Sequence, residues 1–151
     1  MKKISPIFIL IIFFVAGFFL LRYGPAPEYQ VDDTHYISID NVKVKVDFAL
    51  TPEEQARGLS GRVSLGENEG MLFVFPAPGR HYFWMQDMRF PIDIIWVGED
   101  KHVIFVEKNA SPASFPNSFG PNADSKYVLE VNAGFADLHY LKVGDEVQLD
   151  F

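Results

Sequence analysis

FWMQDMRFPIDIIW, residues 83 to 96, decides the fold, because it predicts two apolar strands that meet at Pro91. Nearly every residue in it is apolar or aromatic, yet it carries two carboxylates, Asp87 and Asp93. Successive side chains of a strand point to opposite faces, and both faces of residues 92–97 are apolar, so we expect this strand to be central. A carboxylate buried there without a partner is costly, so Asp93 must be paired, hydrogen-bonded or protonated.

Two interpretations of Asp93 follow. In the structural one, it accepts backbone N–H bonds or pairs with an arginine such as Arg57, Arg62 or Arg89, and so stabilises the turn at Pro91. In the functional one, it faces a ligand at the mouth of the fold. The sequence leaves both open.

Short apolar segments bounded by turn residues continue on both sides of this stretch, which is typical of β-strands. Residues 42–48 alternate most regularly, with apolar side chains on one face and charged ones on the other. Strands are predicted at residues 35–39, 42–48, 70–76, 81–87, 92–97, 102–107, 126–132 and 146–151. Turns are expected at 77–79 and 98–100, a helical turn within 133–141, and a long loop at 109–125 that could close a pocket.

A short helix is predicted at TPEEQARGL, residues 51–59. Thr51 is a suitable N-cap, Pro52 suits the first helical position, and Glu54 completes a capping box with Thr51. Gly58 or Gly61 would end the helix. The pattern as a whole predicts a mainly β or α+β fold: a compact antiparallel β-barrel or sandwich-like single domain with one or two short helices.

The first residues predict a membrane segment. Residues 4–21 contain no charge, and at 1.5 Å per residue they approach the length needed to cross a hydrocarbon core of about 30 Å. We therefore expect an N-terminal signal anchor or transmembrane helix at 1–22, a linker at 23–34 and a domain at 35–151. The alternative is a cleaved signal peptide.

Charge suggests where the domain lies. Lys2 and Lys3 favour a cytoplasmic N-terminus, which predicts a single-pass protein of the cytoplasmic membrane with its C-terminal domain in the periplasmic or extracellular space. The absence of cysteine fits such a compartment. All 20 acidic residues lie at or beyond Glu28, against 10 of the 13 Lys and Arg, so a nucleic-acid partner, which needs a basic surface, is not expected.

Five blocks in order resemble the domain-of-unknown-function family 192: LTPEEQARGLSGR, GMLFVFP, FWMQDMRFPIDIIWV, YVLEVNAG and VGDEV. The resemblance covers about residues 38–151. It implies a compact, mostly β domain, often behind an export or anchor segment, and implies no reaction. Ser60 stands where the family commonly has Met, and Asp87-Met88 where it often has Asn-Thr.

The main functional hypothesis is a non-catalytic binding or accessory domain. Its partner would be a small ligand, an envelope polymer or an envelope protein, with no cofactor. The candidate pocket residues are Met71, Phe73, Trp84, Met85, Asp87, Asp93 and Glu130. No catalytic nucleophile and no metal ligand set is predicted among them.

Two alternatives use the same segment. An envelope hydrolase would pair carboxylates among Asp87, Asp93 and Glu130. A copper(I)-handling module would use His81, Met85 and Met88 beside Trp84, because thioether and imidazole ligands select Cu(I); alternation places Met88 opposite His81 and Met85, which argues against it. Zinc is not expected, since the four histidines are scattered.

Overall fold

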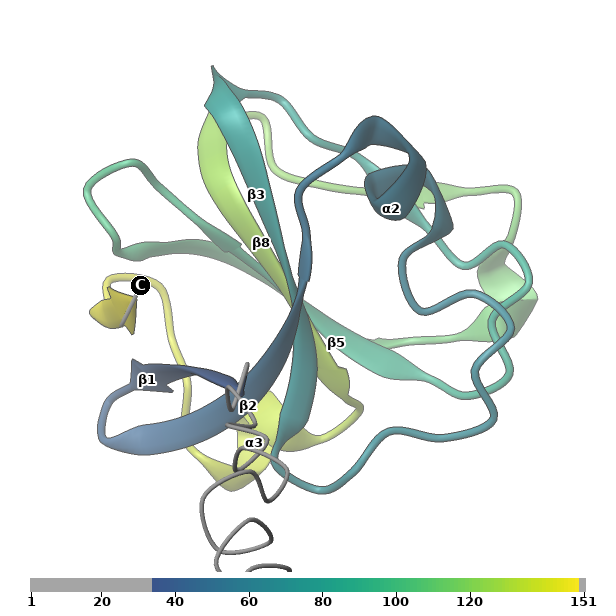
Figure 1. Cartoon of the computed structure of the whole chain (residues 1–151), viewed down its shortest axis with the longest axis horizontal. Helices are drawn as coiled ribbons and strands as arrows, with labels where there is room; N and C mark the ends of the chain where they lie inside the picture. Colours follow the sequence, from purple (N-terminus) through teal and green to yellow (C-terminus); the bar gives the residue numbers. More distant parts are fainter. Residues whose placement is uncertain (1–33, 150–151) are drawn as a thin grey trace, which may run out of the picture. The chain divides into compact units, whose positions relative to one another are not determined.

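The computed structural model describes residues 34–149, which form a curled seven-stranded sheet and a separate pair of short strands (Figure 1). The large sheet has the order β6-β5-β8-β3-β2-β1-β9, and β4 pairs with β7. The strands are β1 His35–Ile39, β2 Val42–Ala49, β3 Glu69–Gly79, β4 Phe83–Trp84, β5 Ile92–Val97, β6 Val103–Ala110, β7 Ser118–Phe119, β8 Ser125–Asn132 and β9 Val147–Leu149. The helices are α2 Pro52–Arg57, α3 Phe135–Leu138 and the 3₁₀ turn η1 Pro112–Ser114.

The predicted membrane segment at 1–22 and nearly all of the predicted linker lie outside the described residues, as does the end of the last predicted strand. Within residues 34–149 there is no helix long and apolar enough to span a bilayer.

The sheet is curled so far that its two edge strands meet at one end. His102, just before β6, forms a bridge with Glu146, just before β9. The Val103 N–H donates to the Asp145 carbonyl and the Val147 N–H donates to the Lys101 carbonyl. Pairing the edges in this way removes exposed backbone groups that would otherwise invite another strand.

The central strands separate two hydrophobic cores. Every residue of β5 is buried, as its unbroken apolar sequence predicts, and its side chains alternate between the two cores. The α3-side core consists of Ile37, Ile39, Val44, Val46, Leu72, Ile95, Val97, Val103, Leu129, Val131, Phe135, Ala136, Leu141 and Val147. The pocket-side core consists of Ala49, Leu59, Met71, Phe73, Met85, Ile92, Ile94, Trp96, Ala110 and Val128.

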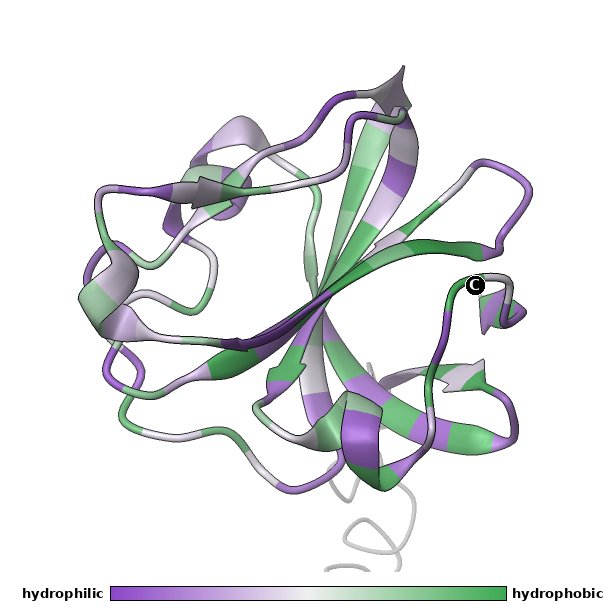
Figure 2. Ribbon diagram, turned by 180° about the vertical axis from the view of Figure 1, so that it is seen from behind, coloured by the Kyte–Doolittle hydropathy of each residue, from purple (hydrophilic) through white to green (hydrophobic). Residues whose placement is uncertain are grey.

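The strand β2 alternates between buried and exposed side chains. In β2 the side chains on one face are buried, whereas those of Lys43, Lys45 and Asp47 are exposed. Figure 2 shows this as alternating hydrophobic and hydrophilic residues along the ribbon. The period of two predicted at residues 42–48 is therefore confirmed.

The expectation of a purely antiparallel sheet is wrong at one pair. β2 and β3 run parallel, with Phe48 opposite Leu72. Parallel neighbours need a crossover connection rather than a hairpin, and residues 50–68, which include α2, provide it. Figure 1 shows α2 in this connection.

Four boundaries differ from those predicted by more than one residue. β6 ends at Ala110 rather than at residue 107. β3 continues through residues 77–79, after a register shift between Val74 and Gly79. The predicted strand 81–87 shortens to β4, because the chain turns at Gln86-Asp87 and Asp87 has a φ of 55°. The loop 109–125 contains η1 and β7, so it is partly ordered by pairing with β4.

Candidate functional site

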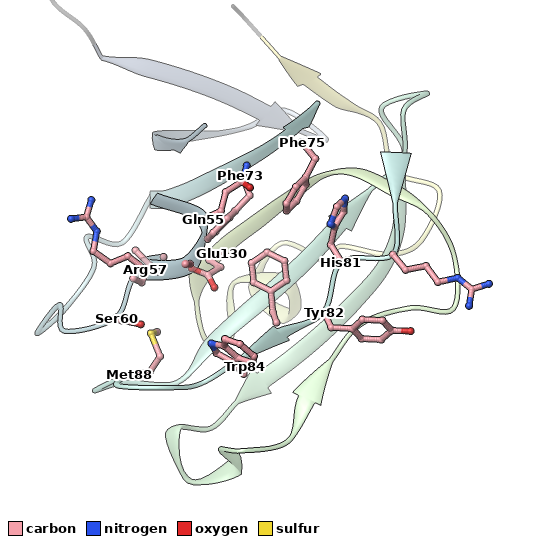
Figure 3. A pocket seen from close by; sticks show the side chains of 15 residues that line it. Gln55, Arg57, Ser60, Phe73, Phe75, His81, Tyr82, Trp84, Met88 and Glu130 are labelled. Carbon is pink, nitrogen blue, oxygen red and sulfur yellow. The ribbon is translucent and has the colours of Figure 1, made fainter. Parts of the chain in front are cut away.

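A cavity of about 330 Å³ opens on the pocket-side face of the sheet, between α2 and β4 (Figure 3). We call it the Glu130 pocket. Its walls are mostly aromatic and come from β3, β4 and the segment before β4: Phe73, Phe75, His81, Tyr82, Phe83 and Trp84. Its polar side chains include Gln55, Arg57, Ser60, Arg80 and Glu130. A cavity of this size lies at the lower end of the range for small-ligand sites.

Glu130 supplies the only carboxyl group among the residues that line this pocket. It lies on β8 opposite Ile94 of β5, and its side chain follows Val128 to the pocket-side face. The residue is 4% exposed, and its Oε2 has no hydrogen-bond partner among the described residues. Figure 3 shows its carboxyl group among the labelled side chains of the pocket.

Burial determines the charge of Glu130. Removal from water disfavours the ionised form and raises the pKa of Glu130 to about 8. A hydrogen bond from the Leu59 backbone and the positive charge of Arg62 lower the pKa of the same carboxyl group, but by less. At neutral pH the group is therefore mainly a neutral carboxylic acid that both donates and accepts a hydrogen bond.

The helix α2 and the residues after it form one wall. Thr51 and Glu54 make the reciprocal capping box that the sequence predicts, and Gly58 ends the helix with a φ of 51°. A Cβ atom at Gly58 would lie 3.2 Å from the Phe73 ring and 3.4 Å from Glu130 Oε2. Glycine here meets both requirements, since it adopts a positive φ readily and leaves room for the carboxyl group.

Side-chain hydrogen bonds hold this wall against the sheet and the turn after β4. The Gln55 amide donates to the carbonyls of Ala49 and Val74. The Ser60 hydroxyl donates to the Gln86 carbonyl at 2.8 Å, and the Gly61 N–H donates to the Asp87 carbonyl at 2.9 Å.

The opposite wall is fixed by aromatic packing. The Phe83 ring meets Phe73 edge-on at 4.8 Å and Trp96 at 5.7 Å between ring centroids. The buried Trp96 Nε1 donates to the His81 carbonyl at 2.8 Å. Pairing of β4 with β7 sets Phe83 opposite Phe119. These contacts make β4 a rigid side of the pocket although it has only two residues.

His81 contributes a second polar atom without a partner. Its ring stacks on Phe75 with centroids 3.4 Å apart, and its Nε2 is buried with no hydrogen-bond partner among the described residues. Burial lowers the pKa of His81, against the opposing effects of Asp124 and the Ser125 backbone. The imidazole is therefore neutral at neutral pH.

Asp93 is structural, and its partners are backbone amides rather than an arginine. The carboxylate is fully buried. Its Oδ1 accepts from the Asn109 N–H and its Oδ2 from the Ala136 N–H, each at 2.8 Å. Asp93 thus joins the end of β6 to the first turn of α3, on the face of the sheet that carries Ile95 and Val97.

The structure brings together only three of the seven candidate pocket residues: Phe73, Trp84 and Glu130. Met71 and Met85 belong to the pocket-side core and do not line the pocket. Asp87 is exposed at the turn after β4. The loop 109–125 contributes no residue to the pocket lining, so it supports β4 through β7 instead of closing the cavity.

The structure also bears on the hydrolase and copper(I) hypotheses. Asp93 and Glu130 occupy adjacent strands but opposite faces of the sheet, so they do not form a catalytic pair. The copper set is divided: His81, Trp84 and Met88 line the pocket, whereas Met85 is 1% exposed in the core. The alternation that set Met88 apart from His81 fails because the strand ends at Trp84. In the described part of the chain, no three His, Asp or Glu residues lie close enough to hold a metal.

Sequence reasoning missed Gln55, Gly58, Phe75 and Tyr82 as pocket residues. Only Gly58 carried a local signal, as the glycine that follows a capped helix. The others line the pocket because β3, α2 and β4 meet there, and no spacing in the chain encodes that meeting.

Comparison with solved structures supports the fold. A protein of unknown function from Novosphingobium aromaticivorans shares 33% sequence identity with a TM-score of 0.71, over 75% of this chain and 83% of that one. A Sinorhizobium meliloti protein, provisionally described as a transcription regulator, shares 24% identity with a TM-score of 0.73, over 77% and 93% of the two chains. A search of curated proteins finds no match.

The sequence of residues 35–149 matches the family DUF192, described as "Uncharacterized ACR". This span includes every described strand and both walls of the Glu130 pocket. The resemblance noted in the five sequence blocks is thereby confirmed, and the chain belongs to the DUF192 family.

Proposed function

We propose that this domain is a non-catalytic binding module whose ligand occupies the Glu130 pocket. The observation that carries the proposal is the buried, unpartnered Oε2 of Glu130 in an aromatic cavity that is open to solvent. A buried polar atom without a partner costs about 1–3 kcal/mol. A ligand that hydrogen-bonds to this oxygen removes that cost. Ligand binding therefore explains why a carboxyl group is buried in this pocket.

The composition of the pocket argues against hydrolysis. Glycoside hydrolysis in its usual form needs two carboxyl groups on either side of the scissile bond, and only Glu130 lines this cavity. The Ser60 hydroxyl, the only serine in the lining, already donates to the Gln86 carbonyl. The pocket has the groups to orient a ligand rather than to transform it.

We further propose that the domain works outside the cytoplasm, tethered by residues 1–22. The uncharged run at 4–21 and the preceding lysines support this topology. A reporter enzyme that is active only outside the cytoplasm, fused after residue 151, tests it. Activity of the fusion in the membrane fraction is expected, and a fusion that is produced at full length but inactive would reject the placement.

A thermal-shift screen with a matched variant tests ligand binding. The probes are neutral saccharides, choline, acetate, Cu(I) and Zn²⁺, with Cu(I) included because His81 and Met88 line the pocket. We expect at least one probe to raise the unfolding midpoint of the wild-type chain by several degrees. In Glu130→Met the shift is lost while the variant stays folded, because an apolar side chain of similar size fills the site but offers the ligand no hydrogen bond.

The opposite pattern would reject the binding hypothesis. If no probe shifts the wild type and Glu130→Met melts early, the carboxyl group has a structural role through its bond with the Leu59 backbone.

A further inference from the structure

We propose that the Glu130 pocket binds a sugar residue of a neutral glycan, stacked on Trp84, and that Tyr82 supports the next residue of the same chain. This inference rests on the proposed function, because it names the ligand class of the same pocket. Three independent features of the described residues carry it: the hydrogen-bonding groups, the distribution of charge and the exposed aromatic faces.

The unpartnered polar atoms in the pocket suit hydroxyl groups. Glu130 Oε2 and His81 Nε2 are both buried without a hydrogen-bond partner among residues 34–149. A neutral carboxylic acid and a neutral imidazole each offer donor and acceptor capacity. A hydroxyl group also donates and accepts, so a sugar hydroxyl complements either group, whichever tautomer the imidazole adopts.

The distribution of charge disfavours an ionised ligand. Arg57 and Arg80 line the pocket and are themselves cationic, so neither offers a cation a partner, and Arg62 forms an ion pair with Asp47 at 2.7 Å. Figure 3 shows the Arg57 guanidinium directed away from the other labelled side chains, so it does not offer an anion a partner at Glu130. Arg62, whose positive charge acts on Glu130, is already paired with Asp47, so an anion placed there would lose its hydration and gain only this shared positive charge.

Two aromatic residues that line the pocket, Tyr82 and Trp84, are also exposed to solvent, and we call them the rim. Trp84 is 53% exposed and Tyr82 is 54% exposed, although both line the pocket. The C–H face of a sugar ring is apolar while its edge carries the hydroxyls. A ring stacked on Trp84 therefore covers an apolar surface that water would otherwise contact and can turn its edge toward Glu130.

The segment around β4 places two exposed aromatic side chains at the mouth of the pocket. Tyr82 precedes β4 and Trp84 belongs to it, and Phe83 between them packs against Phe73 and Trp96. Figure 3 shows the Tyr82 and Trp84 side chains extending in different directions from this segment. Phe83 therefore anchors the backbone that carries both residues, and each of their side chains can contact a different residue of one glycan chain.

Isothermal titration with the full-length chain tests this proposal, in a detergent that has no sugar headgroup. The probes are glucose, mannose, galactose and N-acetylglucosamine, each as the monomer and as β-linked oligomers, with choline and acetate as charged comparisons. Tryptophan fluorescence gives a second readout, because Trp96 is fully buried and Trp84 is exposed. We expect saturable binding of at least one saccharide series, tighter for oligomers than for the monomer, with a change in Trp84 emission.

Variants of the rim separate stacking from structural effects. Trp84→Ala is expected to raise the Kd about tenfold or more for monomer and oligomers, and Trp84→Phe to keep most of the affinity. Tyr82→Ala is expected to raise the Kd several-fold for oligomers and to leave the monomer unchanged. Tyr140→Ala is the control, since Tyr140 is 87% exposed and does not line the pocket.

The experiment distinguishes a wrong ligand class from a wrong binding function. If choline, acetate or a metal ion binds in a Glu130-dependent manner while no saccharide does, the ligand class is wrong and the proposed binding function stands. If no probe of any class binds, both proposals are rejected. Saccharide binding with the same Kd in wild type and Trp84→Ala would overturn the stacking geometry.

Discussion

Asp93 and Glu130 lie on neighbouring central strands, and both carboxyl groups are buried, but their surroundings assign them different roles. Asp93 accepts two backbone N–H bonds that join β6 to α3. Glu130 lies in an open cavity, and one of its oxygens has no hydrogen-bond partner within residues 34–149. At the scale of the single residue, then, hydrogen-bond satisfaction distinguishes a structural acid from a candidate binding group.

Asp93→Asn is expected to lower the free energy of unfolding by about 1–3 kcal/mol. The amide can accept one of the two backbone bonds through its oxygen, but its NH₂ group faces the other N–H donor. Denaturant unfolding monitored by circular dichroism measures the change. Asp87→Asn is the matched control, because an exposed asparagine is well tolerated at the φ of 55° found there; equal losses in the two variants would contradict the structural role of Asp93.

The raised pKa of Glu130, about 8 in the folded protein against the ordinary glutamate value of 4.5, predicts how the free energy of unfolding depends on pH. Between these two values the folded state holds a proton that the unfolded state has released. The contribution of Glu130 to the free energy of unfolding is therefore fully present below about pH 4.5. It is lost as the pH rises through about 8, and over this range the free energy of unfolding falls by roughly 1 kcal/mol per pH unit.

Unfolding free energies of the wild type and Glu130→Met, measured from pH 4 to pH 9, isolate this effect. We expect the unfolding free energy of the wild type to fall relative to that of Glu130→Met as the pH rises across that window. The difference should level off above about pH 8. A difference that does not change with pH would show that Glu130 is ionised in the folded state.

At the scale of elements, α2 matters for the site through the residue that ends it. The capping box fixes where the helix begins, and Gly58 turns the chain so that its backbone lies against Phe73 and Glu130. Hydrogen bonds from Ser60 and Gly61 then tie this turn to residues 86 and 87. One short helix therefore sets the distance between the two walls of the pocket.

Gly58→Ala and Gly61→Ala make a matched pair that tests this role. Both residues have positive φ, 51° and 79°, so each alanine pays about 1 kcal/mol for the left-handed conformation. A Cβ atom at Gly61 meets nothing within 4 Å, whereas at Gly58 it meets Phe73 and Glu130. We expect Gly58→Ala to be the more destabilising and the only one to weaken ligand binding, as measured by thermal unfolding and titration; equal effects would contradict the close packing at Gly58.

At the scale of the whole molecule, the curled sheet separates the larger hydrophobic core from the proposed binding pocket. The larger, α3-side core includes Phe135 and Ala136 of α3 and contains no residue that lines the Glu130 pocket. The pocket-side core shares Leu59 and Phe73 with the pocket. The bridge between His102 and Glu146 joins the two edges of the sheet that lies between these faces.

Leu129→Ala and Phe73→Leu should separate these two faces. Leu129 is fully buried in the α3-side core, so its truncation should cost about 2–5 kcal/mol while the Kd of the folded protein stays unchanged. Phe73→Leu should cost less stability and still weaken binding, because the ring lines the pocket and packs on Phe83. Denaturant unfolding and titration of each variant measure the two quantities, and a changed Kd in Leu129→Ala would show that the faces are coupled.

The sequence by itself determined the features that depend on near neighbours in the chain. Alternation placed the β2 strand, the spacing of Thr51 and Glu54 placed the helix cap, and the apolar surroundings of Asp93 required a partner for it. Only the tertiary structure decided the rest: the parallel pairing of β2 with β3, the early end of β4, and the face to which each acid points. Those outcomes depend on groups far apart in the chain. Asp93 meets amides 16 and 43 residues away, and Glu130 owes its pKa to burial by α2, β3 and β4, which no local pattern encodes.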